Sequence, residues 1–147
     1  MNAYRKAAVM AASLALAWSV PGIAQTNPFT GGDYVSVASI TIDDGHFGDY
    51  AAYLATKWRD QQEFAKAQGW ITSYEVLSNE NKRKGEPDLI LVTRFHNTPD
   101  GAEGERRSKL YLEHVKATDA QMDAASGERA KYRHVDGSQL WQELKFK

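Results

Sequence analysis

The sequence has 147 residues, with 18 Lys and Arg, 19 Asp and Glu, 4 His and no Cys. This length fits one ordinary domain and excludes a TIM barrel or a two-domain dinucleotide enzyme. The net charge of −1 argues against a nucleic-acid-binding protein with a large basic footprint, and an apolar fraction of 42% is too high for a disordered chain.

The N-terminal region is typical of a secretory signal peptide. Arg5 and Lys6 supply a positive start, the apolar run 7–20 follows, and the Gly-Ile-Ala sequence at 22–24 places small residues where signal peptidase recognises them. The alternative is a membrane anchor, but about 14 apolar residues fall short of the roughly 20 that span a bilayer. The sequence therefore predicts a leader over residues 1–24 that is cleaved during Sec-type export to the periplasm or the medium, which leaves no membrane span.

A flexible segment, residues 25–32, is expected to lead into a single domain over residues 33–147. The stretch 34–42 (YVSVASITI) is rich in β-branched residues and apolar on both faces, which predicts a strand in the middle of a sheet. Apolar residues then recur at helical spacing up to Gln68. Asp44 is expected to cap this helix by accepting a free backbone N–H.

Two further strands are predicted on either side of a polar hairpin loop. Residues 70–77 (WITSYEVL) alternate between an apolar and a more polar face, which is typical of an edge strand. After the loop, residues 88–96 (DLILVTRFH) are apolar on both faces and indicate a second central strand.

A second helix and a last strand complete the predicted domain. Pro99 is expected at the first helical position, and a weaker apolar stripe predicts a helix over about 103–125. The stretch 127–137 (GERAKYRHVDG) is interpreted as a polar linker or a short extra turn, and the alternating residues 140–146 as the final strand.

The predicted order β-α-β-β-α-β indicates an α+β domain. With right-handed crossovers, the standard arrangement is a ferredoxin-like, four-stranded antiparallel sheet in the order 4-1-3-2, with two helices on one face. This order puts the strands 34–42 and 88–96 in the centre, in agreement with their two apolar faces.

Two helices cover only one face of such a sheet, and a bare apolar face is unusual on a soluble monomer. A second copy related by a twofold axis is the natural cover, so we expect a homodimer. In its element order and its strands YVSVASITI, DLILVTRF and QLWQELKF, the chain resembles the dimeric α/β-barrel superfamily, which includes antibiotic-biosynthesis-type monooxygenases and NIPSNAP-like proteins. The resemblance covers most of residues 33–147, implies a dimeric α/β barrel and carries no catalytic motif.

The sequence predicts no metal site and no cofactor. None of the four histidines has a partner at i,i+3 or i,i+4, Cys is absent, and the HExxH, GxSxG, P-loop and GxGxxG motifs do not occur. Two alternatives stay open: a metal held by histidines distant in sequence, and haem on one axial histidine, which the superfamily allows.

The end of the third predicted strand is the first candidate site. Arg94 and His96 lie two residues apart on a strand and therefore share a face. In the predicted sheet they come near Tyr34, Trp70 and the end of the last strand. This setting would suit an anionic or phenolic ligand, with His96 as acid or base. The alternative is that both side chains are simply solvated.

The predicted helices carry the second candidate site. Tyr53, Trp58 and His114 are expected to line the space between the sheet and the helices, where the superfamily commonly binds ligands. The alternative is that they belong to the core, as aromatic side chains at helical spacing usually do.

Two functions compete. The first is an exported dimeric protein that binds a small apolar or aromatic ligand without turnover; the second is a cofactor-independent monooxygenase, isomerase or cyclase with His96 or His114 as acid/base. A structural dimer without a pocket is the third interpretation, and neither nucleic acid nor membrane is expected as a partner. The ligand-binding candidates are Tyr34, Tyr53, Trp58, Trp70 and Arg94.

Overall fold

The computed structural model describes residues 27–147, so the predicted leader lies outside the described residues. None of the helices within this range combines the length and the hydrophobicity that a bilayer crossing requires. The elements in chain order are β1 (Phe29–Ile42), α1 (Phe47–Tyr53), the π-helix η1 (Leu54–Trp58), α2 (Arg59–Ala67), β2 (Ser73–Ser78), β3 (Leu89–Phe95), α3 (Gly101–Val115), α4 (Asp119–Arg129) and β4 (Arg133–Phe146).

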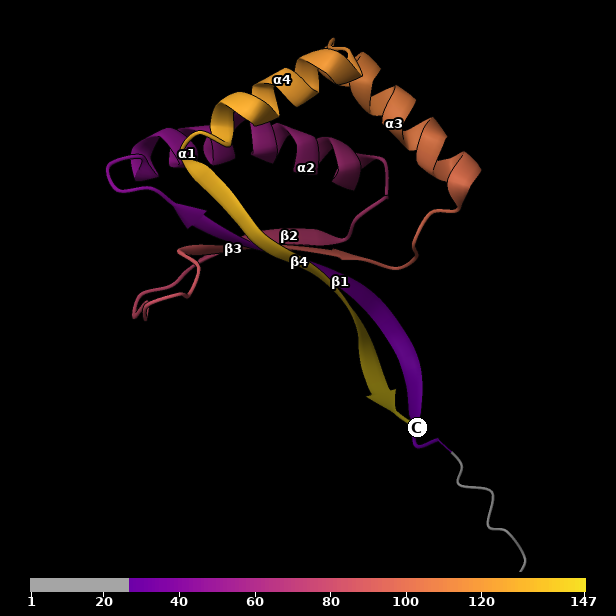
Figure 1. The fold of residues 1–147 in the computed structure, drawn as a ribbon. Coiled ribbons are helices and arrows are strands. Elements are labelled where there is room, and N and C mark those ends of the chain that lie inside the picture. Colours follow the sequence, from indigo (N-terminus) through magenta and orange to yellow (C-terminus); the bar gives the residue numbers. More distant parts are fainter. Residues whose placement is uncertain (1–26) are drawn as a thin grey trace, which may run out of the picture.

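The four strands form one antiparallel sheet in the order β2-β3-β1-β4, with the helices on one side of it (Figure 1). This is the predicted order 4-1-3-2 counted from the other edge, so the ferredoxin-like α+β fold is confirmed. β1 and β3 are the central strands, as their two apolar faces predict. In their register Val37 lies opposite Val92, and Ala38 opposite Leu91.

The buried core lies between the sheet and the first helical segment, α1–η1. The core residues of this segment, Tyr50, Leu54 and Trp58, recur at every fourth position. The wider turn of the π-helix keeps residues at this spacing on the side that faces the sheet. Burial of these side chains removes apolar surface from water and holds the segment on the sheet. The core side chains are Ile40, Ile42, Tyr50, Leu54, Trp58, Leu89 and Leu91.

The prediction of one helix over 103–125 is wrong, because α3 and α4 are separate helices. Lys116 ends α3 in a left-handed conformation, with φ 52°. Thr118 then starts α4 with a capping box, in which the side chains of Thr118 and Gln121 each bond the backbone N–H of the other. α3 packs on α2 through the His114 and Phe64 rings, whose centroids lie 4.1 Å apart, and neither α3 nor α4 contributes a buried residue.

Both helices begin at residues other than those the sequence predicts. A turn through Gly45 (φ +86°) precedes α1, which begins at Phe47, so Asp44 does not reach the capping position. Pro99 lies outside α3, because Asp100 precedes the helix and its carboxylate accepts the backbone N–H of Glu103 at 2.8 Å. A carboxylate there satisfies one of the free donors of the first turn.

β1 and β4 are both longer than predicted. β1 begins at Phe29, so the end of the segment predicted to be flexible, 25–32, is strand. β4 begins at Arg133, so the predicted linker 127–137 holds the end of α4 and the start of a strand. Beyond the end of β3, β1 and β4 continue as a two-stranded arm that projects from the sheet, with Phe29 paired to Phe146 (Figure 1).

The face of the sheet turned away from the helices is also rich in apolar side chains. Because successive side chains of a strand alternate between faces, Val35 and Val37 point away from the core residue Ile40. Val92 is buried on this face although no described helix covers it, whereas Trp141 is 58% exposed. We call this surface the helix-free face; its apolar members are Val35, Val37, Leu77, Ile90, Val92 and Trp141.

Candidate functional site

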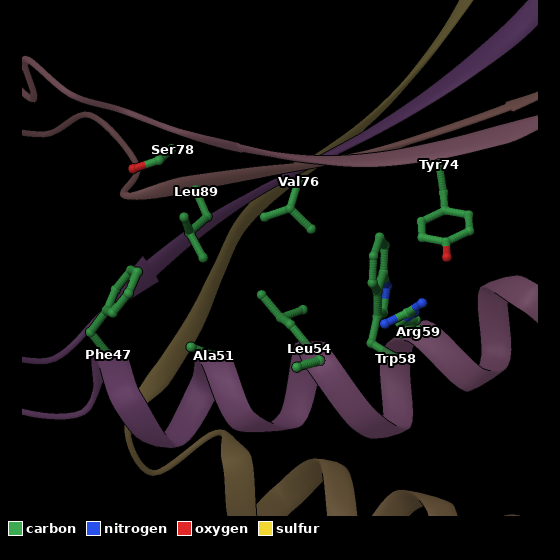
Figure 2. A pocket seen from close by; sticks show the side chains of 10 residues that line it. Phe47, Ala51, Leu54, Trp58, Arg59, Tyr74, Val76, Ser78 and Leu89 are labelled. Carbon is green, nitrogen blue, oxygen red and sulfur yellow. The ribbon is translucent and has the colours of Figure 1, made fainter.

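A cleft of about 500 Å³ opens between the helical segment α1–η1–α2 and the β2 side of the sheet. Figure 2 shows side chains from both layers pointing toward each other across this space. The lining is mostly apolar and comes from Phe47, Ala51, Leu54, Ala55, Trp58, Arg59, Tyr74, Val76, Ser78 and Leu89.

Alternation along β2 places Tyr74 and Val76 on the side of the sheet that faces the helices. The Trp58 ring meets the Tyr74 ring edge-on, with centroids 5.4 Å apart and planes at 84°, and this pair closes one end of the cleft. Phe47 and Val76 line the open part and are 55% and 41% exposed. The cleft therefore presents uncovered apolar surface inside a concavity.

The closed end of the cleft also carries two polar residues, Tyr74 and Arg59, whereas Ser78 lies at the other end (Figure 2). The Tyr74 hydroxyl donates a hydrogen bond to the Glu63 carboxylate, and this bond raises the pKa of Tyr74. The hydroxyl stays protonated at neutral pH, and the neighbouring Arg59 side chain offsets part of this rise in pKa. Arg59 lines the same end and adds a positive charge.

The helical candidates Tyr53, Trp58 and His114 do not share one pocket. Trp58 lines the cleft and is at the same time a member of the buried core. Tyr53 and His114 instead line a second cavity, on the opposite side of η1–α2. His114 binds the Asp60 carboxylate there, with 3.1 Å between Nε2 and Oδ2.

The predicted site at the end of β3 is not assembled as expected. Tyr34 pairs with Phe95 and stacks on its ring at 5.9 Å, so this aromatic pair faces the helix side, whereas Arg94 faces the opposite side. Arg94 lies 3.4 Å from a Glu75 oxygen. Trp70 belongs to another cluster, edge-on to the Phe64 ring.

His96 and the end of β4 are also separated from that aromatic pair. The His96 imidazole lies 2.9 Å from an Asp33 carboxylate oxygen and is 66% exposed. This hydrogen bond is the main cause that lowers the pKa of Asp33. The last residue of β4, Phe146, pairs with Phe29 at the tip of the projecting arm.

No histidine of residues 27–147 lines the cleft. Within the same range, no group of three His, Asp or Glu side chains lies close enough together to hold a metal ion.

Four residues that line the cleft are not among the predicted site residues, namely Phe47, Arg59, Tyr74 and Val76. A signal for them was present: Tyr74 and Val76 alternate on one face of β2, and Phe47 shares a helical stripe with Leu54 and Trp58. These patterns predict that the side chains lie between the helices and the sheet, but they do not distinguish a filled space from an open one.

Comparisons with known proteins give likenesses of structure alone. No protein-family model matches the chain, and no curated protein matches it. HapK from Hahella chejuensis is 8% identical with a TM-score of 0.49, over 78% of this chain and 95% of that one. A dimeric ferredoxin-like protein of unknown function from Thermobifida fusca YX is 14% identical with a TM-score of 0.43, over 80% of this chain and 94% of that one. The ferredoxin-like assignment itself depends on the strand order and registers described above.

Proposed function

We propose that this protein binds a small apolar or aromatic molecule in the cleft between α1–η1–α2 and the β2 side of the sheet. One observation carries the proposal: Phe47 and Val76 face the cleft from opposite layers and keep 55% and 41% of their surface exposed. A ligand between the two layers would remove this apolar surface from water, which is the main source of affinity for apolar compounds.

The polar end of the cleft favours a ligand with one hydrogen-bonding group. The Arg59 guanidinium can donate a hydrogen bond to an oxygen of the ligand. The Trp58 and Tyr74 rings supply flat apolar surface beside these groups. A ring compound with a single hydroxyl satisfies all of these features.

The π-helix also supports a binding role for this cleft. η1 contributes Leu54, Ala55 and Trp58 to the lining. Single π turns inside helices occur frequently at functional sites, because they sacrifice regular hydrogen bonding to reposition side chains.

The test is isothermal titration calorimetry with 1-naphthol on the wild type and on two variants, each of an exposed valine. Val76→Asn places a polar group in the cleft and should weaken binding about tenfold, the effect expected from losing the burial of one aliphatic side chain. Val135→Asn is the matched control, because Val135 on β4 is similarly exposed, at 51%, and does not line the cleft. Equal affinities for the two variants would contradict the proposal.

We further propose that the protein works as a homodimer joined through the helix-free face. Val35, Val37 and Ile90 form a continuous apolar centre on adjacent strands, and Trp141 and Leu77 extend it to both edges of the sheet. Contact with the same face of a second copy is the simplest way to cover such a surface.

Export is the last part of the proposal and is supported by the N-terminal sequence. The positive start at Arg5 and Lys6, the apolar run 7–20 and the small residues at 22–24 together form a Sec-type leader. Native mass spectrometry of protein secreted with its own N-terminus should give a chain that begins at Gln25. A mass that includes residues 1–24 would contradict export by cleavage.

A further inference from the structure

A second cavity, of about 440 Å³, lies between the helices and does not touch the sheet. Tyr53 and Lys57 reach it from α1 and η1, His114 from α3, and Met122 and Arg129 from α4. It lies on the opposite side of the η1–α2 segment from the cleft, so its occupant would be independent of the proposed function.

The charges around this cavity are unbalanced. Lys57 and Arg129 both line it, and neither forms an ion pair with any other residue of 27–147. Asp60 is the one carboxylate in the lining, and His114 already occupies it at 3.1 Å. Two cations and one carboxylate therefore line the cavity, which leaves it with a net positive charge.

Two buried polar atoms at the cavity lack a partner within the described part of the chain. They are the Tyr111 hydroxyl oxygen and Nε of Arg129. Burial raises the pKa of Tyr111 to about 12, so its hydroxyl is a proton donor at neutral pH. Neither atom has surface open to a water-sized molecule, so a ligand in the cavity reaches Arg129 only through the other nitrogens of its guanidinium.

The guanidinium of Arg129 is also held in a fixed orientation. Its central carbon lies 4.1 Å from the centroid of the Tyr53 ring, which is a cation–π arrangement. A guanidinium oriented by a ring presents its planar N–H groups as a fork that matches the two oxygens of a carboxylate.

We propose that this inter-helix cavity binds a small organic acid. The carboxylate pairs with the Arg129 guanidinium and is attracted by Lys57. The body of the molecule is apolar and packs against Val115 and Met122, which line the rest of the space with Ala117 and Ala125. An inorganic anion would leave this apolar part of the cavity unfilled.

The chain offers a direct probe for this site. Methionine occurs at positions 1, 10 and 122, so Met122 is the single methionine of the described residues, and it lines the cavity. With ¹³C-methyl-labelled methionine, sodium benzoate should shift the Met122 methyl resonance in a saturable way. Benzamide has the same shape without the charge and should bind at least tenfold more weakly.

Variants separate ligand recognition from a purely structural role of the same residues. Arg129→Gln and Lys57→Gln should each weaken benzoate binding, whereas Arg106→Gln, an exposed α3 residue paired with Glu103, should leave it unchanged. Benzoate should raise the Tm of the wild type but not that of Arg129→Gln, because only a bound ligand stabilises the folded state.

Three outcomes would overturn the proposal. They are an unchanged Met122 resonance at millimolar benzoate, equal affinities for benzoate and benzamide, and wild-type affinity in Lys57→Gln. The last measurement holds even where Arg129→Gln fails to fold, since Lys57 is exposed.

Discussion

Each of the four histidines pairs with an aspartate, at nitrogen–oxygen distances between 2.8 and 3.1 Å. The aspartate fixes the orientation of each imidazole, and all four rings remain at least one-third exposed. Exposed pairs of this kind contribute little to stability, because water screens their attraction. The pairs therefore place the predicted acid–base candidates at the surface or in the inter-helix cavity. They are His46–Asp49, His96–Asp33, His114–Asp60 and His134–Asp43.

A different carboxylate controls the acid response of α3. Glu103 lies in the first turn of the helix and binds both Arg106 and Arg107, which lowers the pKa of Glu103 to about 2. A lowered pKa stabilises the folded state at pH values above the usual value of 4.5, and this stabilisation disappears as the pH falls through about 2.

We therefore expect Glu103→Gln to lower the free energy of unfolding at neutral pH. The difference from the wild type should shrink between pH 4.5 and pH 2, where the Glu103 side chain takes up its proton. Urea unfolding at a series of pH values measures it. Glu105→Gln, an exposed residue on the same helix turn without an ion pair to the described residues, should show no such trend. A pH-independent difference for Glu103→Gln would refute the assignment.

At the scale of elements, helical periodicity alone gives a wrong prediction at the junction between α3 and α4. The apolar stripe continues across the junction and so predicts one helix, but Thr118 and Gln121 have the spacing of a capping box and signal a new start. Lys116 gives no comparable warning, because lysine rarely adopts a left-handed backbone. Local capping chemistry, which the periodicity does not include, decides the boundary.

Lys116→Gly should stabilise the protein by about 1 kcal/mol, because glycine adopts positive φ without the steric cost that a Cβ imposes. The control is Lys109→Gly, in the middle of α3, which should destabilise by about 1 kcal/mol through lost helix propensity. Chemical unfolding of both variants measures the two effects. A loss of stability in Lys116→Gly would show that its side chain matters more than its backbone.

The start of β4, at Arg133, is difficult to predict from the sequence for a related reason. Asp136-Gly137 looks like a turn, yet both residues lie within the strand, where the register with β1 shifts between Ser39 and Ile40. Asp136 is left out of the pairing, and its carboxylate accepts a hydrogen bond from Thr41. A bulge thus uses the residue types of a turn, and the sequence alone does not distinguish the two.

The candidate cleft was predictable only in part. Strand alternation and helical spacing place Trp58 and Tyr74 on facing surfaces, and the structure brings these rings together. The width of the gap near Phe47 depends on how α1 and η1 sit on the sheet, and the π turn that sets this position leaves no periodic signature. Tertiary packing decides whether facing apolar residues form a filled core or an open site.

At the scale of the whole molecule, the sheet has two apolar faces and its helices cover one. The described core cluster is confined to the helix side, while Val92 is buried on the other side by its neighbours within the sheet. Trp141 and Leu140 occupy adjacent positions of β4, are each 58% exposed, and point to opposite faces. This pair permits a test of the helix-free face at equal exposure on one strand.

We expect Trp141→Lys to weaken the proposed homodimer by about a hundredfold, because the twofold axis places two added charges in one apolar interface. Leu140→Lys adds the same charge to the same strand on the helix side and should leave the dimer intact. Light scattering coupled to size exclusion, across a micromolar concentration series, measures the subunit number of each protein. A monomeric wild type, or equal dissociation of the two variants, would exclude the helix-free face as the interface.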